Sequence, residues 1–323
     1  MERKQLAPGV CITTLDASKF NRCRITLHLR FPAKRESATD AAVLALVLER
    51  GYAACPDMTA LSRRLAELYG ADLGVDLASA GTDRVLSADI CGIKDAYALA
   101  GENLTAAYAD IVFGTIFDPY LVDGAFDPEA VRIETETQAR RLEAEFNSKR
   151  LYCVRQARRK FYGDTPAGIE LGGSATSRLF RNVREKQSLC YYCGSAAQRA
   201  TGVMMIDSGV EPGKEQQAEA AFIAELEGLK NGPITQEEVD DCRRGLLSSM
   251  DALGDSLAAL ENWYYGQITR GEPLYPPEYG KVLTSAVSLD EVRQTLQSYS
   301  YSVCYAVTAE PGTQGKGGSE DVE

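Results

Sequence analysis

The sequence predicts an α+β protein of two halves, each with mixed, largely antiparallel sheets packed with helices. Three observations support this fold class. Several stretches with strand-like alternation follow one another directly, such as 72–79 and 83–91 around Gly81-Thr82-Asp83. Amphipathic stretches with capping residues lie between them. The 323 residues, 45% hydrophobic and 25% charged, have an ordinary globular composition and a length that suggests about two domains.

The first half begins with strands and continues with helices. Asp57 is a candidate cap for the second helix, and Ser37 or Thr39 for the first, while Gly51 and Gly70 follow the two helix ends. After the hairpin, a helix is expected near 94–112. A long helix is then expected after Asp127-Pro128, running to about Phe161. The sequence therefore predicts strands at 10–16 and 22–32 and helices at 38–50 and 58–69.

The second half follows a break at 163–168. We expect its elements to be helices at 172–187, 213–230, 235–262 and 288–298, and strands at 189–198, 202–210 and 300–309. The Gly- and acid-rich end is expected to be disordered. The predicted domains are 1–168, 169–310 and a tail at 311–323.

Composition excludes several classes of protein. A net charge of −11 argues against a nucleic-acid partner, which requires surplus Lys and Arg on one face. No stretch resembles a membrane span of roughly 20 apolar residues, and the N-terminus lacks the apolar core of a signal peptide. Nine scattered cysteines, an odd number, fit a reducing compartment. We expect a cytoplasmic protein with no membrane partner.

The single histidine restricts the possible chemistry. His28 lies in an alternating stretch, where it is expected to be a solvated or satisfied strand residue. It could serve a Ser-His-Asp or Cys-His site only as the sole base. Cys190 and Cys193 have Cys-x-x-Cys spacing, but residues three apart in a regular strand point to opposite faces. The sequence therefore favours neither a metal nor a cofactor.

Residues 171–192 carry a more specific pattern. Gly-Gly-x-x-x-Ser-Arg-Leu-Phe is followed by Arg184-Glu185-Lys186 and a Leu-x-Tyr strand. This pattern resembles the C-terminal half of pitrilysin/insulinase metallopeptidases. Gly-Pro-Ile-Thr-Gln-Glu-Glu-Val at 232–239 and Leu-Tyr-Gly-Ala at 68–71 agree with it. The likeness is greatest to bacterial members without zinc that are associated with aminopentanol modification of elongation factor P, and it implies two related α+β halves.

The resemblance also locates the family's zinc motif. In the family, His-x-x-Glu-His on the first helix binds zinc, and its Glu activates water. Aligned by the glycine after the helix, the motif falls on apolar residues. Glu134 and Glu136, where a third ligand would be expected, are interpreted as helix-surface carboxylates. The motif positions are Ala42, Val43, Leu44, Ala45 and Leu46.

The resemblance implies a remaining substrate site. The family's Arg and Tyr that hold the scissile peptide match Arg184 and Tyr191. A guanidinium can hold a peptide carbonyl, and a phenol can donate to an oxyanion. The alternative is that Arg184 caps a helix and Tyr191 packs in a strand. Domain length also suggests that roughly a hundred residues are missing around 167–171, which would leave sheet edges in need of cover.

The resulting expectation is a catalytically inactive family member. It would form a heterodimer with a zinc-bearing paralogue and help it to process a peptide substrate. Three alternatives stay open. They are a stand-alone peptide-binding or scaffold protein, an enzyme with other chemistry such as a cysteine nucleophile, and a non-functional remnant.

Overall fold

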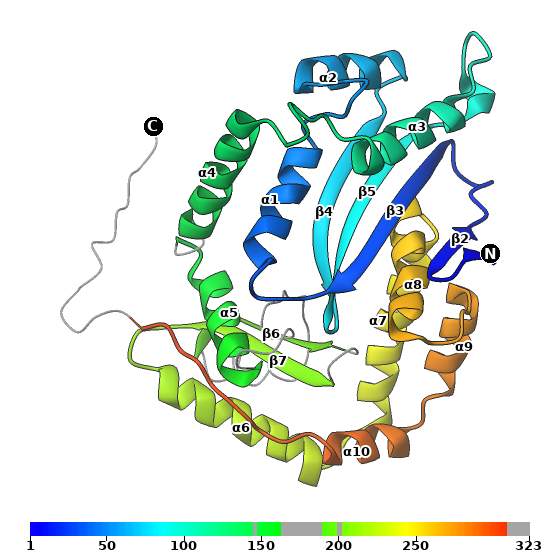
Figure 1. Cartoon of the computed structure of the whole chain (residues 1–323). Helices are drawn as coiled ribbons and strands as arrows, with labels where there is room; N and C mark the ends of the chain where they lie inside the picture. Colours follow the sequence, from blue (N-terminus) through cyan, green and yellow to red (C-terminus); the bar gives the residue numbers. More distant parts are fainter. Residues whose placement is uncertain (145–146, 163–188, 199–201, 309–323) are drawn as a thin grey trace, which may run out of the picture. The chain divides into compact units, whose positions relative to one another are not determined.

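The computed structural model describes residues 1–144, 147–162, 189–198 and 202–308 (Figure 1). The chain divides into two compact units. Unit 1 consists of Met1–Leu142 and Thr235–Glu291, and unit 2 of Glu143–Ile234 and Val292–Glu323. The predicted boundary at residue 168 and the predicted tail at 311–323 lie outside the described residues. Along the described parts of the chain, no helix combines the length and apolar character needed to cross a membrane.

The sheet of unit 1 has three antiparallel strands. They are β3 (Arg22–Pro32), β4 (Asp72–Ala80) and β5 (Asp83–Ile93), in the order β3-β5-β4. A separate ribbon, β1 (Glu2–Ala7) with β2 (Val10–Thr14), stands at the N-terminus. Helices mixed with antiparallel sheets confirm the predicted α+β class.

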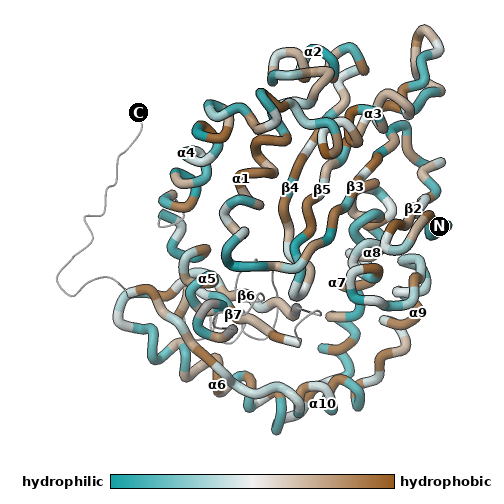
Figure 2. Tube along the Cα trace, viewed as in Figure 1, coloured by the Kyte–Doolittle hydropathy of each residue, from teal (hydrophilic) through white to brown (hydrophobic). Residues whose placement is uncertain are grey.

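One face of this sheet is apolar. Ile25 lies opposite Ile90, and Leu27 opposite Ala88, so the hydrophobic side chains of neighbouring strands share this face. Figure 2 shows hydrophobic residues along all three strands. Three helices supply the other side of this core: α1 (Ala38–Leu48), α2 (Met58–Glu67) and α3 (Leu104–Phe117).

Local signals explain where these helices begin. The Asp57 carboxylate accepts hydrogen bonds from the backbone N–H groups of Thr59 and Ala60, which confirms the predicted cap of α2. Ser37 holds the cap position of α1 but makes no side-chain capping bond. Asn103 caps α3 through the N–H of Ala106. The predicted helix at 94–112 is instead a short 3-10 turn at Asp95–Tyr97 followed by α3.

Unit 1 also contains helices from the later part of the chain. They are α7 (Gln236–Leu253), α8 (Leu257–Arg270) and α9 (Pro277–Ala286). The expected helix at 235–262 is therefore two helices, with a turn at Gly254 between them.

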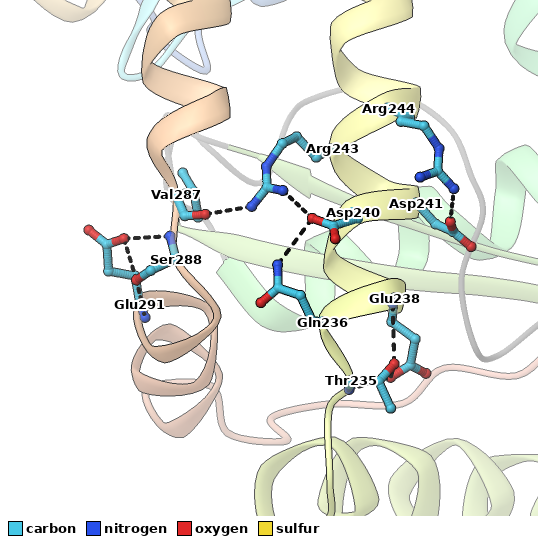
Figure 3. Close-up of polar contacts among 10 residues, drawn as sticks. All are labelled: Thr235, Gln236, Glu238, Asp240, Asp241, Arg243, Arg244, Val287, Ser288 and Glu291. Atoms are coloured by element: carbon cyan, nitrogen blue, oxygen red, sulfur yellow. Dashed lines mark hydrogen bonds and ion pairs between the residues drawn. The ribbon is translucent and has the colours of Figure 1, made fainter.

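Capping bonds fix the start of α7 (Figure 3). Thr235 and Glu238 form a reciprocal capping box. Further along α7, Arg243 donates to the carbonyl oxygen of Val287 at 2.7 Å and pairs with Asp240. This contact ties α7 to the segment after α9. Ser288 and Glu291 form a similar set of bonds at the start of α10 (Leu289–Gln297).

Unit 2 contains a two-stranded antiparallel sheet, β6 (Cys190–Gln198) with β7 (Val203–Val210), and the helices α5 (Lys149–Tyr162) and α6 (Glu215–Asn231). Arg150 on α5 pairs with Asp207 on β7 at 2.5 Å and lies over the ring of Tyr192 on β6. Gly209 lies against that ring, where a Cβ would clash. These contacts join α5 to the sheet.

Two further expectations differ from the structure. The long helix expected to run to Phe161 is two helices, α4 (Pro128–Ala144) and α5. The prediction of a final strand at 300–309 is wrong, because residues 300–308 have no regular secondary structure. Side-chain contacts hold this segment instead: the Cys153 thiol donates to the carbonyl oxygen of Tyr305, and the Tyr301 hydroxyl donates to Glu219. The helix expected at 172–187 lies outside the described residues.

Candidate functional site

The helix expected to hold a zinc motif is apolar on nearly every side. From Ala41 to Leu48 no residue of α1 is exposed, and Ala45, at the position of the general base, keeps 4% of its surface. Alkyl side chains offer a cation no lone pair. Among the described residues, no group of three or more His, Cys, Asp or Glu side chains is placed to hold a metal.

The carboxylate expected near the third-ligand position already has a cationic partner. Glu134 on α4 accepts a hydrogen bond from Arg50, just after α1, at 2.6 Å. Their side chains keep only 13% and 29% of their surface. Interpreting Glu134 as a surface carboxylate was therefore wrong, because the guanidinium allows it to be largely buried. The Arg50 guanidinium thus neutralises the carboxylate charge that a bound metal would otherwise neutralise.

Glu136 differs from Glu134. Its side chain is half-exposed and pairs with Arg132 one turn earlier on α4, at 2.5 Å. Arg132 also binds Glu129, so the three residues form a solvated ladder along the helix. The interpretation of Glu136 as a surface carboxylate is confirmed.

The two expected peptide-holding residues can be followed only in part. Arg184 lies outside the described residues. Tyr191 lies on β6 and keeps 65% of its surface. It lies in a strand, as the alternative interpretation expected, but its side chain is exposed. Its phenol is accessible, so it remains a candidate to donate a hydrogen bond to a bound peptide.

A β-bulge sets the position of Tyr191. Cys190 lies opposite Val210, whereas Tyr192 lies opposite Gly209, so two residues of β6 span one step of β7. Tyr191 is the extra residue. The bulge also overturns the expectation that Cys190 and Cys193 point to opposite faces. Both are buried in one cluster with Leu189.

The other candidate site surrounds the single histidine. The Nδ1 atom of His28 lies 2.8 Å from the Ser87 hydroxyl, and its Nε2 atom lies 3.3 Å from the Glu261 carboxylate. A hydroxyl, an imidazole and a carboxylate in series can activate a nucleophile. Here, however, the Tyr265 ring covers the imidazole, with ring centroids 3.8 Å apart.

Further charges complete this cluster. Arg24 binds Glu261 at 2.7 Å and Asp89 at 2.9 Å. Burial opposes the negative charge of Glu261, but the contact with His28 and the charge of Arg24 outweigh it, so the pKa of Glu261 is lowered. The cluster joins α8 to the polar face of the sheet. The expectation of a satisfied strand histidine is confirmed.

The later part of the chain matches a known protein family. Residues 170–246 fit the family model described as the peptidase M16 inactive domain. A Bacillus subtilis (strain 168) protein named "Probable inactive metalloprotease YmfF" is 30% identical over 96 residues. Residues 170–246 therefore carry a domain of the pitrilysin/insulinase family of peptidases. The chain has one histidine in all, so it lacks the histidine pair that binds zinc in that family.

The matched region is a small part of each protein. The aligned part is 30% of this chain and 22% of the Bacillus subtilis relative, so the chain spans about a fifth of that relative's length. The activity, substrates and partners of whole family members are therefore proposals for this chain.

Two solved structures share the fold of this chain. A conserved protein from Enterococcus faecalis V583 superposes with a TM-score of 0.81 at 18% identity, covering 92% of this chain and 95% of the other. A peptidase M16 inactive domain from Pseudomonas fluorescens gives 0.61 at 16% identity, covering 86% and 90%. The shortening expected near residue 170 lies outside the described residues.

Sequence patterns missed the residues that hold these clusters together. Arg50 lies 84 positions from Glu134 in the sequence, and Arg24 lies 237 positions from Glu261. No periodicity links residues at such separations. Only the strand alternation around His28 and Arg24 indicated that the two share a face.

Proposed function

We propose that this chain is the non-catalytic subunit of a peptide-processing pair, which assists a zinc-bearing family member. One observation carries this proposal. The helix of the zinc motif has apolar residues at every motif position, and Arg50 occupies the carboxylate of Glu134. The motif helix and the paired Glu134 offer no group to activate water, so the partner would cleave the peptide bond.

Peptide holding is the second part of the proposal. The exposed Tyr191 on β6 supports it, because a phenol at a strand bulge can donate to a peptide carbonyl or oxyanion. Arg184 would supply a charge-assisted hydrogen bond to the same peptide.

Surface features of unit 1 support association with another chain. Phe113 and Phe117 stack at 6.0 Å at the end of α3, with 48% and 63% of their surfaces exposed. Tyr120, Leu121 and Val122 follow in the next loop and are also exposed. Exposed large apolar side chains that gather in this way are a common feature of protein interfaces.

Metal analysis and co-purification test the first part. The purified chain should contain no stoichiometric zinc after incubation with zinc and gel filtration. The tagged chain should recover a zinc-bearing family member from its native cell. Phe117→Glu should reduce that recovery, whereas Tyr279→Glu, at another exposed aromatic on α9, should not. Recovery of no such partner by the wild-type chain would contradict the paired role.

Peptide binding tests the second part. Fluorescence anisotropy with a labelled peptide from a substrate of the co-purified partner should show weaker binding for Tyr191→Phe and Arg184→Ala. Loss of one hydrogen bond weakens binding roughly 10-fold. Tyr279→Phe is the matched control, an exposed tyrosine in unit 1. Equal affinity for Tyr191→Phe and wild type would contradict a role of the phenol.

The alternative of a stand-alone peptide-binding or scaffold protein gives a different result. It keeps the effect of Tyr191→Phe on peptide affinity, but no zinc-bearing relative is recovered. We further propose a cytoplasmic location, because all nine cysteines are free thiols. Fractionation of the native cell checks this.

A further inference from the structure

The bulge in β6 places two thiols side by side. Cys190 and Cys193 stand opposite Val210 and Ser208, which are two residues apart on β7 and therefore share a face. The spacing of the two cysteine backbones is thus close to that of residues i and i+2, roughly 6.6 Å. Disulfides bridge Cα atoms up to roughly 6.8 Å apart. A regular strand would have kept these thiols apart.

Both thiols are held in place by their surroundings. They keep 8% and 6% of their surfaces and pack with Leu189, Ile206 and Phe222. The Ser208 hydroxyl donates to the carbonyl oxygen of Tyr192 at 2.8 Å, which fixes the strand between the two cysteines. Each thiol therefore has the other as a close neighbour in a protected position.

We propose that Cys190 and Cys193 form a redox pair that a peroxide closes into a disulfide across the bulge. Cys190 loses its proton, and its sulfur attacks one peroxide oxygen, which gives a sulfenic acid and hydroxide. The sulfur of Cys193 then displaces the sulfenic hydroxyl, and its proton leaves with that group as water. In total, two thiols and one hydrogen peroxide give one disulfide and two waters.

The assignment of roles follows from the surroundings of Cys193. Burial, and then the charges of Cys190 and Asp207, raise the pKa of Cys193 to about 12. Cys193 therefore keeps its proton and acts second, after Cys190 has reacted. The small size of hydrogen peroxide suits a pair with so little exposed surface.

The modification has a direct structural consequence. Tyr191 is the extra residue of the bulge and lies between the two cysteines. A disulfide draws their backbones together and changes the direction of the Tyr191 side chain. If Tyr191 holds a peptide, which rests on the proposed function, oxidation changes peptide affinity. Disulfide formation itself does not depend on that function.

Peptide mapping tests the pair directly. The full chain is treated with hydrogen peroxide, alkylated under denaturing conditions and digested with trypsin. Cleavage after Lys186 and Arg199 releases both cysteines on one peptide, 187–199. The expected product has lost two hydrogens and carries no alkyl group. In Cys193→Ser, Cys190 should instead accumulate as a sulfenic acid that a 1,3-dione traps.

Internal controls make the result decisive. The exposed Cys242 reports that the oxidant was active, and Cys55, with 7% exposed, reports on burial alone. A 187–199 peptide that stays doubly alkylated while Cys242 is oxidised would overturn the proposal. Equal oxidation of Cys55 and the pair would also overturn it, because unfolding would then explain both. Failure of peptide binding with a disulfide present would count only against the proposed function.

Discussion

The imidazole ring of His28 lies flat on the phenol ring of Tyr265, with centroids 3.8 Å apart and an angle of 17° between the planes. This contact joins β3 to α8, two elements far apart in the sequence. The stack, the Arg24–Glu261 pair next to it and a hydrogen bond from Arg30 to the carbonyl oxygen of Thr269 all join α8 to the polar face of the sheet.

The stacking makes Tyr265 a structural residue. Tyr265→Ala should lower the free energy of unfolding by about 2 kcal/mol, through lost ring contact and the cavity left behind. Tyr265→Phe keeps the stacked ring and should change it by less than about 0.5 kcal/mol. Urea denaturation monitored by circular dichroism measures both. Equal losses for the two variants would show that the hydroxyl, and not the stack, matters.

The lowered pKa of Glu261 predicts a pH dependence. Burial opposes its charge, but the contact with His28 and the charge of Arg24 outweigh burial and bring the pKa below its ordinary value of 4.5. A carboxylate with a lowered pKa stabilises the fold above its unfolded pKa, and this contribution is lost as pH falls through the folded pKa. At neutral pH the free energy of unfolding of wild type should therefore exceed that of Glu261→Gln by about 1–3 kcal/mol.

Urea denaturation of both proteins at a series of pH values tests the direction of this pH dependence. The stability difference between wild type and Glu261→Gln should narrow as the pH drops below 4.5, the ordinary value. Asp290→Asn, at an exposed acid in the first turn of α10, is the control and should show no comparable narrowing. A difference that stays constant down to the acid limit would contradict the role of the Glu261 charge.

The Arg50–Glu134 pair predicts strong coupling. Removing either partner leaves a largely buried charge without its counter-ion, so Arg50→Ala and Glu134→Ala should each cost about 2–4 kcal/mol. The double variant should lose less free energy of unfolding than the two single variants lose together. A double-mutant cycle in urea measures the coupling. Arg132 and Glu136 provide an exposed comparison, with expected coupling of about 0.5 kcal/mol.

Gly92 predicts a packing defect. A Cβ at this position would overlap the ring and hydroxyl of Tyr108, which is completely buried. Gly92→Ala should therefore lower the free energy of unfolding by about 1–3 kcal/mol, measured by thermal or urea denaturation. Gly245→Ala is the control, on the exposed face of α7 with nothing near the new Cβ, and should be neutral or slightly stabilising. A neutral Gly92→Ala would mean that Tyr108 can move aside.

Elements with strong local signals could be predicted from the sequence. The β3 strand has the predicted bounds, because eleven alternating residues lie between turns. Asp57 caps α2 as expected, because the cap depends on neighbours within three residues. The separate start of α5 at Lys149 and the end of α7 at Gly254 were not predicted, because helical periodicity continues across both and tertiary packing decides between one helix and two.

The sequence by itself determined the α+β class, the family resemblance, the strand around His28 and the loss of the zinc motif at Ala42–Leu46. Each depends on residue type or short-range spacing. The tertiary structure alone decided that Arg50 neutralises Glu134, that Glu261 binds His28, and that a bulge at Tyr191 brings Cys190 beside Cys193. These are contacts between distant segments or shifts of strand register, and no local pattern of residues specifies either.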